Sequence, residues 1–230
     1  MPRIIPYWTC RLTLFRSIDL KPGVEAGFTT RHFPLVLHKT DDLLDHVNQK
    51  KFVSLFNGRR GGFQTRPYTK FALLDQVHGD GIVVIEKDPG KGIHHFKECD
   101  AVITNIPGLA LLVFTADCLS IFYTAGDWIA LAHAGWRGTK QKIAQKTFKM
   151  LLEKSKKRPE DVKVVFGPSI RACHYESDLP GENRRQLSEV GLPVRSITDL
   201  GICTIDENDN FYSFRKEKDS AGRIISYIVK

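Results

Sequence analysis

Three side chains that can bind a metal lie where polar motifs interrupt short apolar runs. His78 precedes a glycine-rich turn and an apolar run, Cys118 stands between two apolar runs, and His133 ends another. Apolar runs of this length are typical of strands, and strand ends can present side chains into a shared cleft. We therefore expect the two imidazoles and the thiol to meet at one edge of the fold.

Two histidines and one cysteine suit zinc, because three protein ligands leave a fourth position for water or substrate, as in catalytic sites. Copper also accepts this donor set. The gaps of 40 and 15 residues between His78, Cys118 and His133 match no short zinc signature. A cysteine between apolar runs can instead be an inert core residue. The spacing alone leaves the metal site and the core residue open.

A nucleophilic cysteine is a further interpretation of the same residues. Cys118 could act as the nucleophile of a cysteine hydrolase with His133 as its base, an arrangement that gives His78 no role. Asp117, which precedes Cys118 in the chain, could relay protons, orient a ligand or make only structural hydrogen bonds.

The segment GWRGT at residues 135–139 leads from an apolar run into a helical pattern. Backbone N–H groups at a helix N-terminus, with Gly135 allowing close approach and Arg137 alongside, would form a phosphate or carboxylate site. Glycine can equally serve the turn alone.

Short apolar runs outnumber helical patterns along the chain. Helical periodicity is clear over residues 139–156 and weaker over 41–56 and 182–190. Strands are expected over residues 81–86, 101–104, 109–114, 119–123, 128–132, 162–166 and 197–199. Buried strands flanked by one strong helix favour a mixed α+β fold, with sheets covered by helices packed outside. No linker divides the chain, so we expect residues 1–230 to form a single domain.

The composition is that of a globular protein. Of the 230 residues, 42% are hydrophobic and 26% are charged, which excludes the disordered and fibrous classes. No apolar stretch approaches the roughly 20 residues of a membrane span. The five cysteines form no CxxC pair and the N-terminus lacks a signal-peptide pattern, so we expect a cytoplasmic protein.

The net charge of +8 makes anionic partners worth considering. Much of the excess consists of lysines on the outer face of the helix predicted at 139–156. A solvated face is favoured over a nucleic-acid interface, because no aromatic residues interleave with these lysines and no nucleic-acid-binding motif accompanies them. A basic nucleic-acid-binding module remains the nonenzymatic alternative.

The other histidines and cysteines carry weaker signals. His94 and His95, followed by Cys99, are expected on a polar loop rather than in a second metal site. The remaining cysteines are interpreted as ordinary thiols: Cys10, Cys173 and Cys203. His174, next to Cys173, is the one residue near these thiols that carries a weak functional signal.

Six motifs, in order, resemble the laccase-domain or polyphenol oxidase family. Members of that family are better described as zinc-dependent purine nucleoside phosphorylases with adenosine deaminase and methylthioadenosine phosphorylase activity. The pairing of TADC with HAGWRG is highly specific to it. The motifs are FTTR (28–31), QVHG (76–79), DAVITNIPGLALLVFTADCLSIFY (100–123), HAGWRGT (133–139), FGPSI (166–170) and FYSFR (211–215).

The resemblance implies a sandwich of mixed β-sheets and a catalytic zinc held by His78, Cys118 and His133. It implies purine nucleosides (adenosine, inosine, guanosine and methylthioadenosine) and phosphate as substrates, with no nucleic acid or membrane partner, in a monomer or homodimer. Arg31 and Arg137 lie in family motifs and are candidates for substrate or phosphate contacts. A copper-dependent polyphenol oxidase stays an alternative, although multicopper chemistry usually needs more than the eight histidines present.

Overall fold

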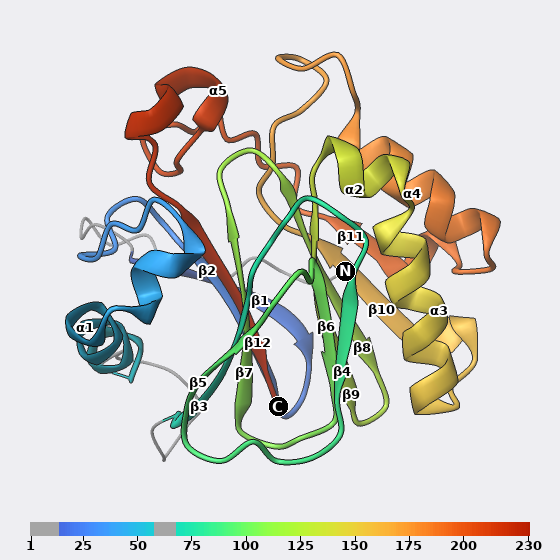
Figure 1. The fold of residues 1–230 in the computed structure, drawn as a ribbon. Helices are drawn as coiled ribbons and strands as arrows, with labels where there is room; N and C mark the ends of the chain where they lie inside the picture. Colours follow the sequence, from blue (N-terminus) through green and yellow to red (C-terminus); the bar gives the residue numbers. More distant parts are fainter. Residues whose placement is uncertain (1–13, 58–67) are drawn as a thin grey trace.

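Two six-stranded mixed sheets pack face to face in the computed structural model, which describes residues 14–57 and 68–230 (Figure 1). The first sheet has the order β1-β2-β12-β7-β3-β5 and the second β11-β10-β8-β9-β6-β4. The first contains β1 (Phe15–Lys21), β2 (Val24–Thr29), β12 (Ile224–Val229), β7 (Leu109–Thr115), β3 (Lys70–Leu74) and β5 (Gly92–Phe96). The second contains β11 (Ile197–Asp199), β10 (Val162–Phe166), β8 (Leu119–Ala125), β9 (Trp128–Ala134), β6 (Ala101–Thr104) and β4 (Ile82–Ile85).

The core between the sheets forms because the central strands are apolar on both faces. Every residue of β7 and β8 is buried. Val113 of β7 and Phe122 of β8 share one apolar cluster between the sheets. The hydroxyls of Ser120 in β8 and Ser226 in β12 are 3.0 Å apart, so these two buried polar groups are paired across the layer. The predicted sandwich of mixed sheets is confirmed.

Helices cover the two outer faces, as expected (Figure 1). The first sheet is covered by α1 (His46–Asn57), whose buried residues Phe52 and Phe56 pack in one cluster with strand residues such as Phe71. On the other side α2 (Trp136–Lys140), α3 (Ile143–Ser155) and α4 (Leu179–Glu189) lie beside the second sheet. Phe148 of α3 packs in the cluster that this sheet forms with them, whereas the lysines Lys142, Lys149 and Lys156 are not among the buried residues.

The long helix predicted at 139–156 is two helices. Lys142 has a left-handed backbone with φ of 64°, which breaks the hydrogen-bond ladder between α2 and α3. The segment predicted at 41–56 likewise divides into a 3-10 helix, Thr40–Leu44, and α1. Asp45 separates them, since its side chain accepts the backbone N–H groups of Val47 and Asn48. The helix α4 begins earlier than predicted, because Asp178 accepts the N–H of Gly181.

All seven predicted strands form, and five more were not predicted: β1, β2, β3, β5 and β12. The expectation that His94 and His95 lie on a polar loop was wrong. Both are in β5, which pairs in parallel with β3. Strand geometry directs consecutive side chains to opposite faces, so these two imidazoles cannot share a metal. The hydrogen-bonding partner β3, and not local polarity, extends this segment.

The candidate site residues lie where these strands end. His78 follows β3, Cys118 lies in the turn by which the chain passes from β7 to β8, and His133 is the second-last residue of β9. Because β8 and β9 are antiparallel, with Leu119 opposite Ala134, Cys118 comes next to Gly135. No helix among the described residues is long and apolar enough to cross a membrane.

Candidate metal centre

The structure brings His78, Cys118 and His133 together. One possible ligand atom from each lies within 4.8 Å of those of the other two. The two imidazole rings have centroids 4.8 Å apart and are nearly perpendicular, at 83°. His133 is buried, Cys118 is partly buried and His78 is exposed, so the cluster opens to solvent on the side of His78. The sequence predicted this meeting of strand ends, and its geometry suits a three-ligand site with one open position.

A buried carboxylate that the sequence analysis missed holds two of these residues. The Oδ1 atom of Asp100 lies 2.7 Å from His133 Nδ1 and accepts the backbone N–H of His78 at 3.0 Å. Its Oδ2 atom accepts the N–H of Gly79 at 2.7 Å. Asp100 is 0% exposed, and hydrogen bonding to His133 lowers its pKa even though burial alone would raise it. Asp100 therefore presents the other nitrogen of His133, Nε2, to the cluster.

The segment around His78 is fixed on its other side by Gln76. The Gln76 amide donates to the carbonyl of Phe114 and accepts the N–H of the same residue, at 2.8 and 2.7 Å. This pair of bonds extends the end of β7 as a neighbouring strand would. His78 itself has φ of 60°, a backbone conformation that a non-glycine residue adopts at a cost and that the bonds to Asp100 and Gln76 maintain.

The electrostatics of the cluster favour a thiolate. Burial alone would raise the pKa of Cys118, but the charge and hydrogen bonds of His133 and His78 outweigh it and lower the pKa to about 6. Burial would likewise lower the pKa of His133, yet Cys118 and Asp100 raise it to about 9. Without a metal these shifts favour a thiolate paired with an imidazolium near neutral pH. A metal cation would replace the imidazolium proton as the partner of the thiolate.

Gly135, which the sequence analysis placed in a substrate-binding turn, packs directly against two of the candidate ligands. A Cβ atom at this position would lie 2.8 Å from Cys118 Sγ and 3.1 Å from His78 Cδ2. Any larger residue would therefore push two of the three candidate ligands away. The helix that follows Gly135 has only five residues, so the predicted start of a long helix at this turn was wrong.

Asp117 uses both carboxylate oxygens inside the protein. Oδ1 accepts the hydroxyl of Thr204 and Oδ2 accepts the backbone N–H of Arg215, each at 2.6 Å. Its φ of 89° turns the chain sharply between β7 and β8. Of the roles considered for Asp117, these contacts favour the structural one: it ties the C-terminal segment to the turn that carries Cys118.

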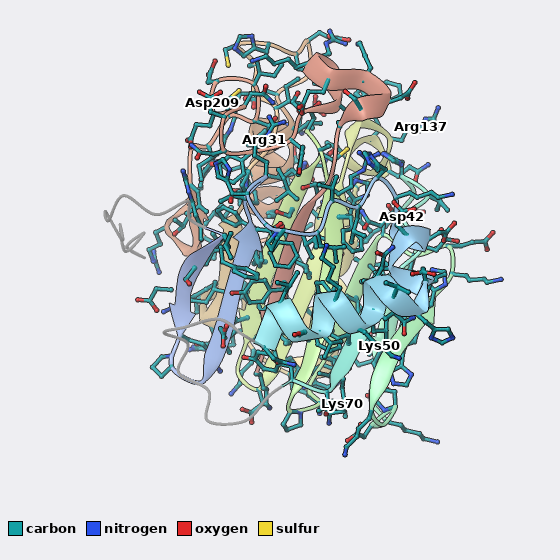
Figure 2. The ribbon with its side chains drawn as sticks, turned by 90° about the vertical axis from the view of Figure 1, so that its left-hand side faces the viewer. Arg31, Asp42, Lys50, Lys70, Arg137 and Asp209 are labelled. Atoms are coloured by element: carbon teal, nitrogen blue, oxygen red, sulfur yellow. The ribbon has the colours of Figure 1, made fainter. Side chains whose placement is uncertain are left out.

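The two candidate arginines lie at the same end of the molecule, opposite Lys50 and Lys70 (Figure 2). Arg31 is already engaged, because its guanidinium bonds Glu217 at 2.7 Å and the carbonyl of Asn208 at 2.6 Å. Arg137 is exposed, and its side chain has no hydrogen bond or ion pair with any described residue. Of the two, only Arg137 has a guanidinium available for an anion.

Sequence reasoning missed another cation, Arg223. Its guanidinium is partly buried and donates to the backbone carbonyls of Ala221 and Gly222. Burial lowers its pKa, while the negative charges of Cys118, Asp42 and Asp117 act in the opposite direction. A partly buried arginine close enough to feel the Cys118 charge is a further candidate for binding an anionic substrate. Arg223 lies just before β12 and outside the six family motifs, so the sequence did not indicate a functional role for it.

This two-sheet fold and this cluster define a β-sandwich protein with a candidate three-ligand metal centre. The chain belongs to the family described as multi-copper polyphenol oxidoreductase laccase, whose model matches residues 60–179 and 174–230. The family resemblance inferred from the six motifs is confirmed.

Relatives of known name come from several bacteria. The chain is 29% identical over 262 residues to purine nucleoside phosphorylase YfiH of Escherichia coli, covering 98% of this chain and 97% of that protein. It is 38% identical over 182 residues to a purine nucleoside phosphorylase of Aquifex aeolicus, covering 70% of this chain and 83% of the relative. The crystal structure of YlmD from Geobacillus stearothermophilus, 24% identical, has a TM-score of 0.78 and is covered over 99% of both chains. The last match shows the shared fold.

The donor set fits zinc better than a multicopper centre. The chain has eight histidines, all within the described residues, and no group of candidate ligands there contains more than two of them. Two imidazoles and a thiolate, with a carboxylate behind one imidazole, are a common zinc environment. A single copper ion remains compatible with the same donors.

Asp100→Asn tests the carboxylate behind His133. We expect the zinc affinity to fall about 10- to 100-fold, because the asparagine amide is neutral and its NH₂ group cannot accept the N–H of Gly79. Competition with a chromophoric chelator measures the affinity. Asp88→Asn, which removes an exposed carboxylate bonded to Lys70, is the matched control and keeps wild-type affinity. Unchanged zinc binding in folded Asp100→Asn protein would contradict this role.

Alkylation of Cys118 separates a metal ligand from a nucleophile. As a zinc ligand, Cys118 reacts slowly with iodoacetamide in the metal-loaded protein and faster after chelation. In the metal-free protein a lowered pKa keeps the thiolate as the pH falls to about 6, so the rate decreases only below that pH. Mass-spectrometric peptide mapping measures the rates, with Cys99 as the internal reference. Rapid labelling that does not respond to chelator would contradict the metal-ligand role and favour a nucleophilic cysteine.

Proposed function

We propose that this chain is a zinc-dependent purine nucleoside phosphorylase that also deaminates adenosine, acting as a single domain. Its proposed substrates are phosphate with adenosine, inosine, guanosine or methylthioadenosine. The observation that carries the proposal is the cluster of His78, Cys118 and His133 with Asp100 behind it. The names of the relatives supply the reaction class.

The chain's own residues would perform most of the positioning. His78, Cys118 and His133 would hold the metal, and Asp100 keeps His133 in the orientation that presents Nε2. Bound zinc would supply Lewis-acid chemistry at its open position, polarising the ligand that occupies it. Asp117 and Gln76 hold the two loops that carry Cys118 and His78.

Phosphorolysis requires a bound anion next to the nucleoside. A phosphate oxygen attacks the anomeric carbon of the ribose, the bond from that carbon to the purine nitrogen breaks, and the departing purine takes up a proton. Arg137, which is exposed and unpaired among the described residues, and Arg223, near Cys118, would hold the phosphate and offset its charge. Deamination uses water in place of phosphate and releases ammonia from the purine ring.

Apolar side chains next to the cluster suit a purine base. Trp136 is 47% exposed and Val77 is 49% exposed, and they are the chain neighbours of Gly135 and His78. Large apolar groups are usually buried, so their exposure beside candidate ligands is informative. An indole can stack on a purine, which would place the base at the open side of the cluster.

One specific observation favours a second function. Cys118, His133 and Asp100 form a line of nucleophile, base and orienting carboxylate, as in cysteine hydrolases. The lowered pKa of Cys118 agrees with this arrangement too. The hydrolase triad needs no second histidine, whereas the metal site uses His78 as a third ligand, and for that reason we favour the phosphorylase.

A base-release assay tests the proposed function. With phosphate present, zinc-loaded protein releases hypoxanthine from inosine and adenine from methylthioadenosine, and chromatography measures the free base. Without phosphate, adenosine yields only inosine and ammonia. His78→Ala is inactive in both assays because it removes a metal ligand. Base release that does not need phosphate, or oxygen consumption with phenols after loading with copper, would overturn the proposal.

Arg137→Ala tests the anion site. We expect kcat/KM for phosphorolysis to fall about ten- to a hundredfold, which corresponds to one charge-assisted hydrogen bond of roughly 1.5 to 3 kcal/mol. Deamination, which binds no phosphate, stays near wild type. Arg195→Ala, at an exposed arginine before β11, is the control and changes neither rate. Equal losses in both reactions of Arg137→Ala would show general damage rather than a phosphate contact.

A further inference from the structure

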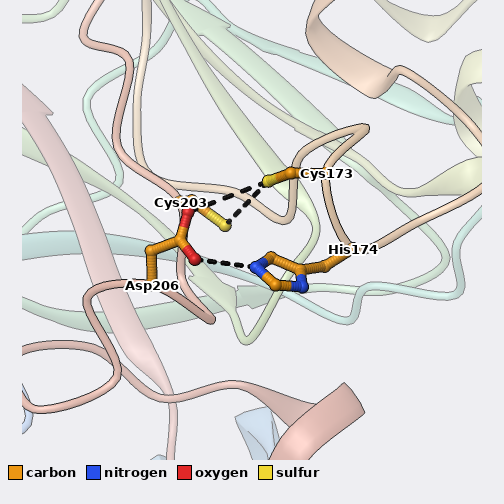
Figure 3. A group of neighbouring side chains, drawn as sticks. All are labelled: Cys173, His174, Cys203 and Asp206. Carbon is orange, nitrogen blue, oxygen red and sulfur yellow. Dashed lines mark hydrogen bonds and ion pairs between the residues drawn. The ribbon is translucent and has the colours of Figure 1, made fainter.

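A second group of metal-binding side chains lies outside the first cluster. Cys173 and His174 belong to the loop between β10 and α4, and Cys203 and Asp206 belong to the loop that follows β11 (Figure 3). One possible ligand atom from each of the four lies within 4.8 Å of those of the others. Cys203 is buried and the other three are exposed, so the group is anchored in the protein and open to solvent.

We propose that Cys173, His174, Cys203 and Asp206 bind a second zinc ion. Two thiolates, one imidazole and one carboxylate would fill all four positions of a tetrahedral zinc. A site whose four ligands all come from the protein is closed, so its role is structural rather than catalytic. The proposal depends on these four residues only and is independent of the proposed function.

The distances in the group match those of a tetrahedral zinc site. With Zn–S bonds of about 2.3 Å, two sulfur ligands lie about 3.8 Å apart. The Sγ atoms of Cys173 and Cys203 are 3.9 Å apart, far more than the roughly 2.05 Å of a disulfide bond. Asp206 Oδ2 is 3.8 Å from Cys173 Sγ, which agrees with a carboxylate and a thiolate on one metal.

One distance must change when the metal binds. His174 Nε2 and Asp206 Oδ1 are 2.7 Å apart, a hydrogen bond that holds the imidazole and the carboxylate next to the sulfurs. Two ligand atoms at about 2.0 to 2.1 Å from a tetrahedral zinc are about 3.4 Å apart. With Oδ2 of Asp206 as the ligand atom, Nε2 gives up its hydrogen bond to Oδ1 and turns to the metal, where it lies about 3.4 Å from Oδ2. His174 and Asp206 are both on the surface, so the protein can accommodate this movement.

A dication offsets most of the negative charge that the four ligands carry when both thiols are ionised. Desolvation and the neighbouring Cys203 side chain raise the pKa of Cys173. The hydrogen bond to His174 lowers the pKa of Asp206. On zinc binding both thiols release their protons to solvent and His174 binds as the neutral imidazole. Zn²⁺ then offsets the two thiolates that would otherwise repel each other.

The second zinc would connect two loops at the rim of the first cluster. Thr204, next to Cys203, donates to Asp117, the neighbour of Cys118. On the other loop Tyr175 lies against the Arg215 guanidinium at 5.4 Å, and the backbone N–H of Arg215 also donates to Asp117. A metal that ties Cys173 and His174 to Cys203 would hold both loops against the segment that carries Cys118.

Zinc content distinguishes the two sites. We expect wild-type protein, expressed with zinc and dialysed against metal-free buffer, to contain two zinc ions per chain by elemental analysis. Cys173→Ser, at an exposed position that tolerates substitution, and His78→Ala each contain one, and the double variant contains none. Cys99→Ser is the matched control with two. In the His78→Ala background, Co²⁺ produces a thiolate charge-transfer band that His174→Ala weakens.

Three outcomes would overturn the second site. One is wild-type zinc content in Cys173→Ser protein. Another is a single zinc in the wild type that His78→Ala removes completely. The third is a disulfide between Cys173 and Cys203, found by peptide mapping of protein purified with zinc and reductant. Circular dichroism of each variant shows that it is folded, so a loss of metal in Cys173→Ser reports on the ligand and not on the fold.

Discussion

The carboxylate of Asp100 is the contact on which the candidate metal centre depends. Asp100 lies immediately before β6 and is inaccessible to solvent, yet its carboxylate bonds the backbone N–H groups of His78 and Gly79 and the side chain of His133. A buried ionised group is tolerated only when it is paired and fully hydrogen-bonded. The loop after β3 supplies two of the hydrogen bonds that the buried carboxylate needs. The carboxylate in turn holds that loop next to β9.

The candidate metal ligands meet at one end of the sandwich because the chain passes from the first sheet to the second at that end. The turn from β7 to β8 passes from the first sheet to the second and places Cys118 opposite the end of β9. Asp117 stabilises that turn through the side chain of Thr204 and the backbone of Arg215. Asp117 thereby ties two loops of the C-terminal part of the chain to the turn that carries Cys118. Asp117 thus connects the two candidate metal groups: Cys118 of the first follows it in the chain, and Thr204, next to Cys203 of the second, donates to its carboxylate.

The pattern of apolar runs was sufficient for the central strands and insufficient for the edges of the fold. Strands such as β7 are buried on both faces, so their sequence is an almost unbroken apolar run and predicts a strand by itself. The segment with His94 and His95 is a strand only because β3 pairs with it. Lys142 could continue a helix by propensity, but it has a left-handed backbone between α2 and α3. Pairing and packing partners decided these elements.

The sequence by itself determined the family, the central strands and the three candidate ligands, because motif residues at strand ends are local features of the chain. Only the tertiary structure identified Asp100, since its role consists of contacts with His78 and His133, residues 22 and 33 positions away. It also showed that Arg31 is engaged by Glu217 and that Arg137 is exposed. Cys173 and Cys203 appeared as separate thiols in the sequence. They became neighbours because β10 and β11 pair in parallel, which brings the loops after these strands to the same edge.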